Sequence, residues 1–246
     1  MLILKERIDR VLVDLEIVPS RNKAQALIKA GAISVNGVVA KKANQLVSEE
    51  DNFVILNDPC PWVSRAGLKM VHAIEHFKPK FNKDTVCLDI GASTGGFTQV
   101  LLSHDVREVF AIDVGIDQLH DSLREDSRVI VLEKTDARNL DVNMFPPIDV
   151  IVVDVSFVGI EKILSVPLSL ARSGACVIAL IKPQFQVGRT NIGRGGIVKE
   201  NGAVHECLKS TEDFFTENDW LVQEIIPSCI TGADGNQEYC LYAIKK

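Results

Sequence analysis

The sequence lacks any apolar run long enough to cross a membrane. A helix that spans a bilayer needs about 18–20 apolar residues in a row, and no segment of the 246-residue chain approaches this. The N-terminus, Met1-Leu2-Ile3-Leu4-Lys5-Glu6-Arg7, also lacks the apolar core and cleavage site of a signal peptide. With 46% hydrophobic and 24% charged residues, the composition is typical of a globular protein. We therefore expect a cytoplasmic protein.

The six cysteines include no CxxC pair, so the usual spacing of a redox or zinc motif is absent. Several cysteines lie in apolar, strand-like runs, and we expect buried free thiols in a reducing compartment. His72 and His76 are four residues apart on a predicted helix and could share one face, but no third ligand accompanies them. We therefore expect no metal. The cysteines are Cys60, Cys87, Cys176, Cys207, Cys229 and Cys240.

The chain also lacks an excess of positive charge, since its net charge is −6 at pH 7. For a nucleic-acid partner, the distribution of charge matters more than the sum. Residues 20–48 and 182–199 contain no acidic residue at all. Each stretch could bind phosphates or could be a solvated charged face, and the charges alone leave both interpretations open. Their cations are Arg21, Lys23, Lys29, Lys41, Lys42, Lys182, Arg189, Arg194 and Lys199.

The first 56 residues predict two helices followed by a hairpin. Apolar residues at helical spacing indicate the first helix, and Ser20 is the predicted N-cap of the second. Gly31 is expected to adopt the left-handed conformation that ends a helix. Asn36-Gly37 between short apolar runs is a strong hairpin signal, and residues 53–56 add a strand. The apolar helix positions are Ile8, Val11, Leu12 and Leu15, then Ala24, Leu27 and Ile28.

A short linker is predicted where the run Asn57-Asp58-Pro59-Cys60-Pro61-Trp62 interrupts regular structure. Two prolines next to an Asn-Asp pair favour a stiff, extended connection. We predict an N-terminal domain over residues 1–58, a linker over 59–64 and a second domain over 65–246.

The second domain alternates apolar strands with helices, which predicts an α/β fold with a mostly parallel sheet covered on both faces. On such sheets, ligands bind at the carboxyl ends of the strands. The predicted helices cover about 95–103, 117–124, 158–171 and 202–217. The predicted strands are Val86–Ile90, Val109–Asp113, Val129–Leu132, Val150–Asp154, Cys176–Ile181, Leu221–Ile226 and Cys240–Ile244.

A glycine-rich turn follows the first of these strands, in Asp89-Ile90-Gly91-Ala92-Ser93-Thr94-Gly95-Gly96-Phe97. No lysine follows the glycines, as a phosphate-binding loop requires, and the spacing is not GxGxxG. A carboxylate two residues before the first glycine is poor for binding pyrophosphate, but it suits a cationic ligand such as S-adenosylmethionine (SAM). A purely structural turn and a different nucleotide remain the alternatives.

Further carboxylates at strand ends extend this predicted cofactor site. Asp113 ends the second strand, where it can accept both ribose hydroxyls of an adenosine. Asp136 follows the third strand and could approach the adenine amino group or cap a helix. The predicted SAM-binding residues are Asp89, Gly91, Ala92, Ser93, Gly95, Gly96, Phe97, Asp113, Val114, Asp136, Ala137 and Asp154.

Two ionisable residues of opposite charge close adjacent apolar strands. Asp154 ends the fourth strand and Lys182 ends the fifth. A charge in such a place costs desolvation unless it is paired or functional. The two residues alone could therefore be an ion pair or part of an active site.

The N-terminal order Arg7-Ile8-Asp9, Ser20-Arg21-Asn22-Lys23-Ala24, Val35-Asn36-Gly37 resembles the S4 RNA-binding domain over about residues 6–56. A small dimerisation or packing module is the alternative. This resemblance and the local positive charge imply RNA contacts by Arg7, Arg10, Arg21, Lys23, Lys29, Lys41, Lys42, Arg65, Arg189 and Arg194.

The motifs of the second domain resemble the TlyA-type ribosomal RNA methyltransferases, within the FtsJ-like 2′-O-methyltransferase group. They are the glycine turn that begins at Asp89, Asp154-Val-Ser-Phe, Lys182-Pro-Gln-Phe and Ser64-Arg-Ala-Gly-Leu-Lys69. The resemblance implies a Rossmann-like, seven-stranded SAM-dependent domain and a catalytic tetrad of Lys69, Asp154, Lys182 and Glu238. Ala66 stands where the family usually has glycine.

The resemblance implies that a methyl group passes from SAM to a ribose 2′ hydroxyl, with Lys182 accepting the proton. Burial and the neighbouring Lys69 would lower the pKa of this lysine, whereas Asp154 and Glu238 would oppose that shift. The sequence leaves open which effect is larger. A non-catalytic RNA-binding or ribosome-assembly factor and a membrane-active haemolysin are the rival functions, although no amphipathic membrane segment is evident.

The resemblance also suggests a cytidine of ribosomal RNA as the target. The chain ends soon after its last strand, which by resemblance favours the short type that modifies large-subunit RNA only. We further expect a monomer, and a loop after Lys182 that becomes ordered when RNA binds. No residue in the sequence identifies the modified nucleotide.

Overall fold

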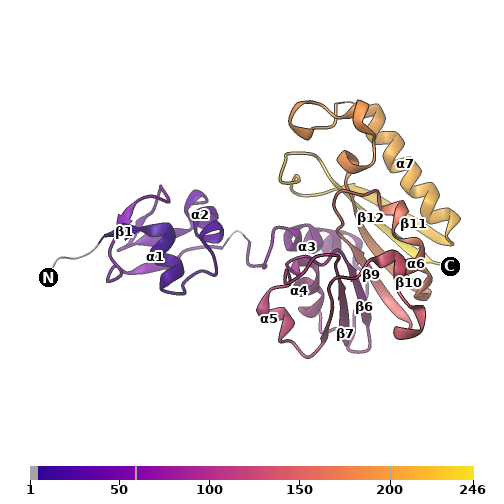
Figure 1. Cartoon of the computed structure of the whole chain (residues 1–246), viewed down its shortest axis with the longest axis horizontal. Helices are drawn as coiled ribbons and strands as arrows, with labels where there is room; N and C mark the ends of the chain where they lie inside the picture. The colour runs from indigo at the N-terminus through magenta and orange to yellow at the C-terminus, as the bar shows by residue number, and fades with distance from the viewer. Residues whose placement is uncertain (1–4, 59, 200) are drawn as a thin grey trace. The chain divides into compact units, whose positions relative to one another are not determined.

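The computed structural model describes residues 5–58, 60–199 and 201–246. The chain divides into two compact units, Met1–Pro61 and Trp62–Lys246, which we describe separately (Figure 1). The division falls within the segment that the sequence predicts to be a linker.

The helices of the N-terminal unit are α1 (Ile8–Asp14) and α2 (Arg21–Lys29). Ser20 caps α2, as predicted, because its hydroxyl accepts a hydrogen bond from the Lys23 amide. Apolar residues at helical spacing meet between the helices and form the core of this unit. The prediction was wrong for Leu15, which follows the last turn of α1 and is 39% exposed.

A small sheet completes this unit. The hairpin joins β2 (Ile33–Val35) to β3 (Val38–Val39), and β5 (Phe53–Ile55) pairs with the other edge of β2. Asn36 and Gly37 both have positive φ, as a two-residue hairpin turn requires. The sequence did not predict β1 (Glu6–Arg7) and β4 (Leu46–Val47), because two-residue strands are too short to show a periodic pattern.

The C-terminal unit contains a seven-stranded sheet in the order β11-β12-β10-β9-β6-β7-β8. Six strands run in one direction and β12 runs against its neighbours, so the prediction of a mostly parallel sheet is confirmed. The chain order reverses between β6 and β9, and a sheet of this kind binds ligands at such a point. The strands are β6 (Val86–Ile90), β7 (Glu108–Ile112), β8 (Val129–Leu132), β9 (Ile148–Val153), β10 (Ala171–Ile181), β11 (Trp220–Pro227) and β12 (Tyr239–Lys245).

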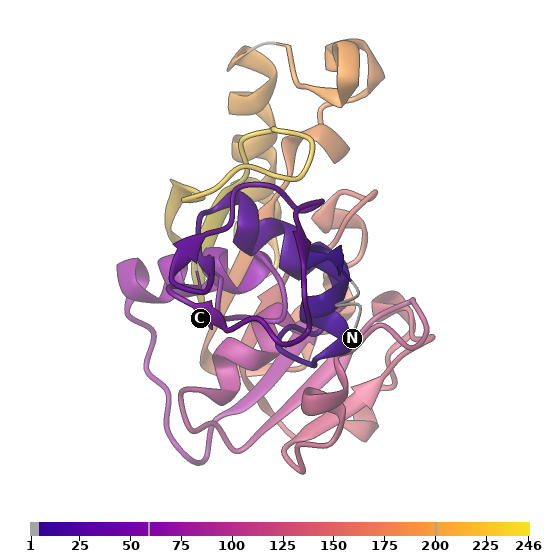
Figure 2. The same ribbon diagram turned by 90° about the vertical axis from the view of Figure 1, so that its left-hand side faces the viewer.

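Helices cover both faces of this sheet. On one face, α3 (Ala66–Phe77), α4 (Gly96–Leu102) and α5 (Asp121–Arg124) contribute to one apolar core, and α3 and α4 lie side by side in both views (Figures 1 and 2). On the other face, α6 (Ser165–Ser169) and α7 (Asn201–Glu217) contribute to a second core. The result is a three-layer α/β/α unit.

Two predicted helices are shorter than expected. The segment 158–171 forms a 3-10 turn, Ile160–Lys162, followed by α6, and β10 already begins at Ala171. Pro167 lacks the amide that a continuous helix would need at this position, but it is tolerated in the first turn of α6. The segment 117–124 is helical only from Asp121, because the amides before it bind the Glu133 carboxylate.

Four cysteines, Cys87, Cys176, Cys207 and Cys240, are buried as predicted. Cys229 is exposed and Cys60 is half-buried, because both lie in loops rather than strands. Across the described ranges, we find neither a helix that could span a membrane nor a group of three metal-binding side chains.

Candidate active site

The glycine turn between β6 and α4 forms the floor of the site. Gly91 has φ 83°, and a Cβ atom there would lie 2.7 Å from the Asp154 carbonyl oxygen. Only glycine therefore lets β6 turn this closely against the end of β9. Gly95 has φ 94° and forms the N-cap of α4, so the turn leads directly into the helix.

Asp89 lies beneath this turn and is fully buried. The Thr98 hydroxyl of α4 donates a hydrogen bond of 2.6 Å to its Oδ2, while its Oδ1 has no hydrogen-bond partner among the described residues. Burial raises the pKa of Asp89 to about 7, although the Thr98 hydrogen bond opposes this shift. The structure therefore places Asp89 behind the turn rather than in the lining of a pocket.

A pocket of about 500 Å³ opens beside the turn, at the ends of β6, β7 and β9. Asp113 lies at its rim, where its carboxylate accepts hydrogen bonds from the Ser93 and Gly115 amides at 2.8 and 2.7 Å. Each oxygen has one such donor, which leaves acceptor capacity for the two hydroxyls of a ribose. Predicted residues Val114 and Ala137 also line this pocket.

Glu133 positions the loop that borders this pocket, a role that the sequence did not predict. Its carboxylate accepts hydrogen bonds from the amides of Leu119, Asp117 and Gln118, and from Arg124. These bonds, with that of Leu119 the largest contribution, lower the pKa of Glu133 to about 2. The carboxylate is therefore ionised at neutral pH and fixes the loop after β7.

Asp136, one of the predicted cofactor residues, caps the 3-10 turn Ala137–Asn139. Hydrogen bonds from the Arg138 guanidinium and amide lower the pKa of Asp136 to about 2. Its neighbours Ala137 and Arg138 line the pocket, whereas Asp136 is not among the lining residues. The sequence left open whether Asp136 approaches an adenine or caps a helix, and in the structure its side chain caps the 3-10 turn.

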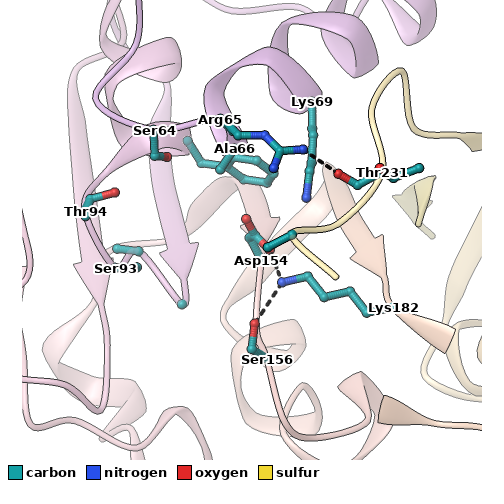
Figure 3. A pocket seen from close by; sticks show the side chains of 14 residues that line it. Ser64, Arg65, Ala66, Lys69, Ser93, Thr94, Asp154, Ser156, Lys182 and Thr231 are labelled. Carbon is teal, nitrogen blue, oxygen red and sulfur yellow. Dashed lines mark hydrogen bonds and ion pairs between the residues drawn. The ribbon is translucent and has the colours of Figure 1, made fainter. Parts of the chain in front are cut away.

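A second pocket, of about 330 Å³, contains three of the four predicted catalytic residues, Lys69, Asp154 and Lys182 (Figure 3). Lys69 extends from α3 and Lys182 from the end of β10 toward the space beside Asp154. The fourth residue, Glu238, lies immediately before β12 and forms an ion pair with Lys69. Residues separated by up to 169 positions in the sequence therefore meet beside the glycine turn.

The four catalytic candidates form two ion pairs. The Lys182 ammonium lies 2.5 Å from the Asp154 carboxylate and donates to the Ser156 hydroxyl at 3.0 Å. The buried Lys69–Glu238 pair is joined by Gln184, whose amide lies 3.3 Å from a Glu238 oxygen. Both lysines are nearly enclosed, so these contacts fix the positions of their nitrogens.

The two pockets share one wall, made of Gly91, Ser93, Asp154 and Ser156. A ligand in the larger pocket can therefore present a group to the lysines in the smaller one. The residues present fit SAM, because Asp113 can bind a ribose diol, apolar side chains suit an adenine, and the Asp154 carboxylate in the shared wall suits a sulfonium. The arrangement can hold two reactants and accept or donate a proton between them.

The predicted RNA-binding residues occupy different surroundings. In the C-terminal unit, Arg65 donates to the Thr231 carbonyl at 2.7 Å beside the smaller pocket, and Arg189 and Arg194 are exposed on the loop after β10. In the N-terminal unit, Lys29, Lys41 and Lys42 are exposed, and Arg10 lies 3.6 Å from Glu6.

Besides Arg10, three cations of the N-terminal unit have carboxylate partners. Buried Asp9 accepts hydrogen bonds from Arg7, Arg21 and Gln25, and the Arg7 guanidinium above all holds its pKa well below the usual range. Lys23, predicted to face a phosphate, donates instead to the Asp58 carboxylate at 2.8 Å and to the Cys60 carbonyl. Any RNA contact by Lys23 would compete with these partners.

Four residues of the site were not predicted from the sequence, namely Ser156, Gln184, Thr231 and Glu133. Ser156 lies in the motif Asp154-Val-Ser-Phe and Gln184 in the motif Lys182-Pro-Gln-Phe. Both residues could have been predicted, because each motif follows the end of a predicted strand. No sequence pattern predicts the roles of Thr231 and Glu133, because each forms its hydrogen bonds with a segment that is distant in the sequence.

Comparison with known proteins gives matches over both units. The profile of the family described as FtsJ-like methyltransferase matches residues 62–245, and the S4 domain profile matches residues 6–53. The chain is 37% identical over 240 residues to the 16S/23S rRNA (cytidine-2′-O)-methyltransferase TlyA of Mycobacterium tuberculosis, with 97% of this chain and 89% of that protein covered. It is 35% identical to the 23S rRNA (cytidine-2′-O)-methyltransferase TlyA of Campylobacter jejuni, with 92% and 94% covered.

A solved structure extends the similarity to three dimensions. A Streptococcus thermophilus protein named as a hemolysin superimposes with a TM-score of 0.76 at 32% identity, over 99% of this chain and 90% of that one. The similarity therefore covers both units and the whole of the candidate site.

Proposed function

Because the chain belongs to the TlyA-type branch of the FtsJ-like methyltransferase family, we propose that it methylates a ribose 2′ hydroxyl of ribosomal RNA, using SAM. The observation that supports this most strongly is the meeting of Lys69, Asp154, Lys182 and Glu238 beside the glycine turn. The S4 domain supports an RNA substrate. We expect the reaction in the cytoplasm, where ribosomes are assembled.

The target that we propose is a cytidine of 23S ribosomal RNA. The two named relatives both act on cytidine, and 23S rRNA is the substrate that their names share. Cytidine in 23S rRNA is therefore the most economical assignment for this chain.

In the proposed reaction, the lysine at the end of β10 accepts the proton of the ribose hydroxyl. A ribose hydroxyl is a weak nucleophile until its proton is accepted in the transition state. Once Lys182 has given up its own proton to solvent, it accepts the proton of the hydroxyl, and Asp154 and Ser156 hold its nitrogen in place. Lys69 projects into the pocket from α3 and pairs with Glu238, so it would keep a second cation near the reacting oxygen (Figure 3).

The remaining residues align the reactants. SAM, when bound, supplies a methyl group already activated by its sulfonium. Asp113 and the glycine turn would hold the adenosine half in the larger pocket, while Asp154 lies in the wall shared with the smaller pocket. Such positioning accounts for a large share of a group-transfer barrier.

The test is to incubate the protein with labelled SAM and isolated small and large ribosomal subunits. We expect label in large-subunit RNA, and mass spectrometry of the digested RNA should place the methyl group on a cytidine 2′ oxygen. Tight SAM binding by calorimetry without transfer to any RNA would instead favour a role in ribosome assembly. Label on a base rather than a ribose would contradict the proposed chemistry.

The loop held by Glu133 gives a first prediction about the cofactor. Glu133→Gln should raise the SAM dissociation constant several-fold, because a neutral amide cannot hold three backbone amides and Arg124 as a carboxylate does. Calorimetry on the free enzyme measures this effect. Glu125→Gln is the matched control, since Glu125 is exposed in the same segment. Equal SAM affinity in both variants would contradict a positioning role for Glu133.

Phe157 gives a second prediction, about the RNA. It is 89% exposed, has φ 68° and lies three residues after Asp154, with its ring 5.2 Å from that of Phe185. An exposed aromatic ring in a strained conformation beside an active site suits stacking of an unpaired base. Phe157→Ala should raise the KM for ribosomal subunits by about tenfold, the expected loss of one base stack. Because Phe157 also lines the larger pocket, SAM affinity is measured beside the KM, and a loss confined to SAM would assign the ring to the cofactor instead.

A further inference from the structure

The loop after β10 begins shortly after Lys182 and carries exposed cations. Arg189 and Arg194 lie within residues 188–199, and neither has an ion pair or hydrogen bond from its side chain to a described residue. Gly188, Gly195 and Gly196 have positive φ, so the backbone of this basic loop has little conformational preference of its own. Hydrogen bonds within the loop join Gly193 to Ile197 and Lys199 to Asn191, and a second segment of the chain adds further contacts.

Asn236 supplies these contacts and is only 3% exposed. Its Oδ1 accepts a hydrogen bond from the Val198 amide at 3.0 Å, and its Nδ2 donates to the Gly196 carbonyl at 2.9 Å. Both bonds reach the returning arm of the basic loop, at residues 196 and 198, and a bridge between Ile192 and Val198 joins this arm to the other one. The basic loop and the loop before β12 lie beside each other in both views (Figures 1 and 2).

The same asparagine also organises the segment 231–238. Its carbonyl accepts from the Gly232 amide at 2.9 Å, and its Nδ2 also donates to Asp234 at 3.0 Å. This segment forms one wall of the smaller pocket through Thr231 and Ala233. It ends at Glu238, the partner of Lys69.

We propose that Asn236 is a positioning residue that couples the basic loop to the catalytic pocket. Phosphates bound by Arg189 and Arg194 would fix the loop, and Asn236 would transmit this order to the pocket wall and to Glu238. Correct RNA binding would thereby complete the site where the target ribose reacts. The inference rests on the proposed function, because it assumes that RNA is the substrate.

A double-mutant cycle tests this coupling in single-turnover reactions with saturating SAM and large ribosomal subunits. Arg194→Gln should lower the rate constant of methyl transfer about fivefold, and Asn236→Ala should lower it about tenfold. A coupling of about fivefold between the two substitutions lies within the range measured for interacting residues. In the Asn236→Ala background, Arg194→Gln should have no further effect. The SAM dissociation constant should remain within twofold throughout.

Asn218→Ala is the matched control, because Asn218 donates one hydrogen bond to the Phe214 carbonyl at the far end of α7. Like Asn236→Ala, Asn218→Ala removes a side-chain hydrogen bond to the backbone. In the Asn218→Ala background, Arg194→Gln should still lower the rate constant about fivefold. Multiplicative effects of Arg194→Gln and Asn236→Ala would overturn the proposal.

Hydrogen exchange of the unmodified protein gives a second test that does not depend on the folding of a variant. Binding of large ribosomal subunits should protect the Val198 amide and also residues 231–238. Protection confined to residues 188–199 would overturn the coupling. If the protein binds the subunits but transfers no methyl group, the proposed function fails, whereas the exchange pattern still decides the role of Asn236.

Discussion

Lys182→Ala should lower the rate of methyl transfer by about a thousandfold or more, while SAM still binds with nearly unchanged affinity. Removal of a general base costs about 10²–10⁴ in rate, and this substitution also removes the partner of Asp154. Lys182 lines only the smaller pocket, whereas the larger pocket with Asp113 is formed by other residues. Binding and chemistry should therefore separate in this variant.

The measurements are methyl transfer to large ribosomal subunits and SAM binding by calorimetry. Lys162→Ala is the control, since this lysine is exposed and lies outside both pockets of the site. Lys182→Met keeps much of the apolar volume, and it should be as inactive as Lys182→Ala if the amine itself is required. Substantial activity in either Lys182 variant would exclude the proposed proton transfer.

The unliganded C-terminal unit should become less stable as the pH rises from 5 to 8, by about 2.5 kcal/mol from Asp89 alone. Burial raises the pKa of Asp89 to about 7, so the folded state keeps this proton up to a higher pH than the unfolded state. A carboxyl group with a raised pKa stabilises the fold when it is protonated. This contribution is present at pH 5 and is lost as the pH passes through about 7.

Other groups with shifted pKa values should contribute little to stability in this pH range. Carboxyl groups with a lowered pKa, such as Glu133 and Asp136, titrate below pH 5, and cysteine thiols with a raised pKa titrate above pH 8. Asp89 is therefore expected to dominate the slope between pH 5 and 8.

Tryptophan fluorescence during urea unfolding measures this effect selectively. Both tryptophans, Trp62 and Trp220, belong to the C-terminal unit, and Trp220 is fully buried. Asp89→Asn, which is neutral at every pH, should flatten the stability profile, whereas Asp84→Asn, at an exposed site nearby, should leave the slope unchanged. A profile that rises between pH 5 and 8 would contradict the neutral state of Asp89.

Much of the architecture follows from local physical chemistry that the sequence contains. Ser20 caps a helix because its hydroxyl meets an amide three residues later. Asn36-Gly37 forms the hairpin turn because both residues tolerate positive φ. Apolar runs became the strands of a parallel sheet, and Asp154 and Lys182 follow two neighbouring strands at the predicted edge. Residues with a local signal were therefore predictable.

The pairing of residues across the site was decided only by the tertiary structure. The sequence predicted four catalytic residues by resemblance, but not that Lys69 would pair with Glu238 and Lys182 with Asp154. Nor did it predict that Asn236 would connect two loops, or that Asp9 and Asp58 would bind three of the cations assigned to RNA. A charged or amide side chain can form hydrogen bonds or ion pairs with many different partners. Only the packing of distant segments determines which of these partners lies within reach.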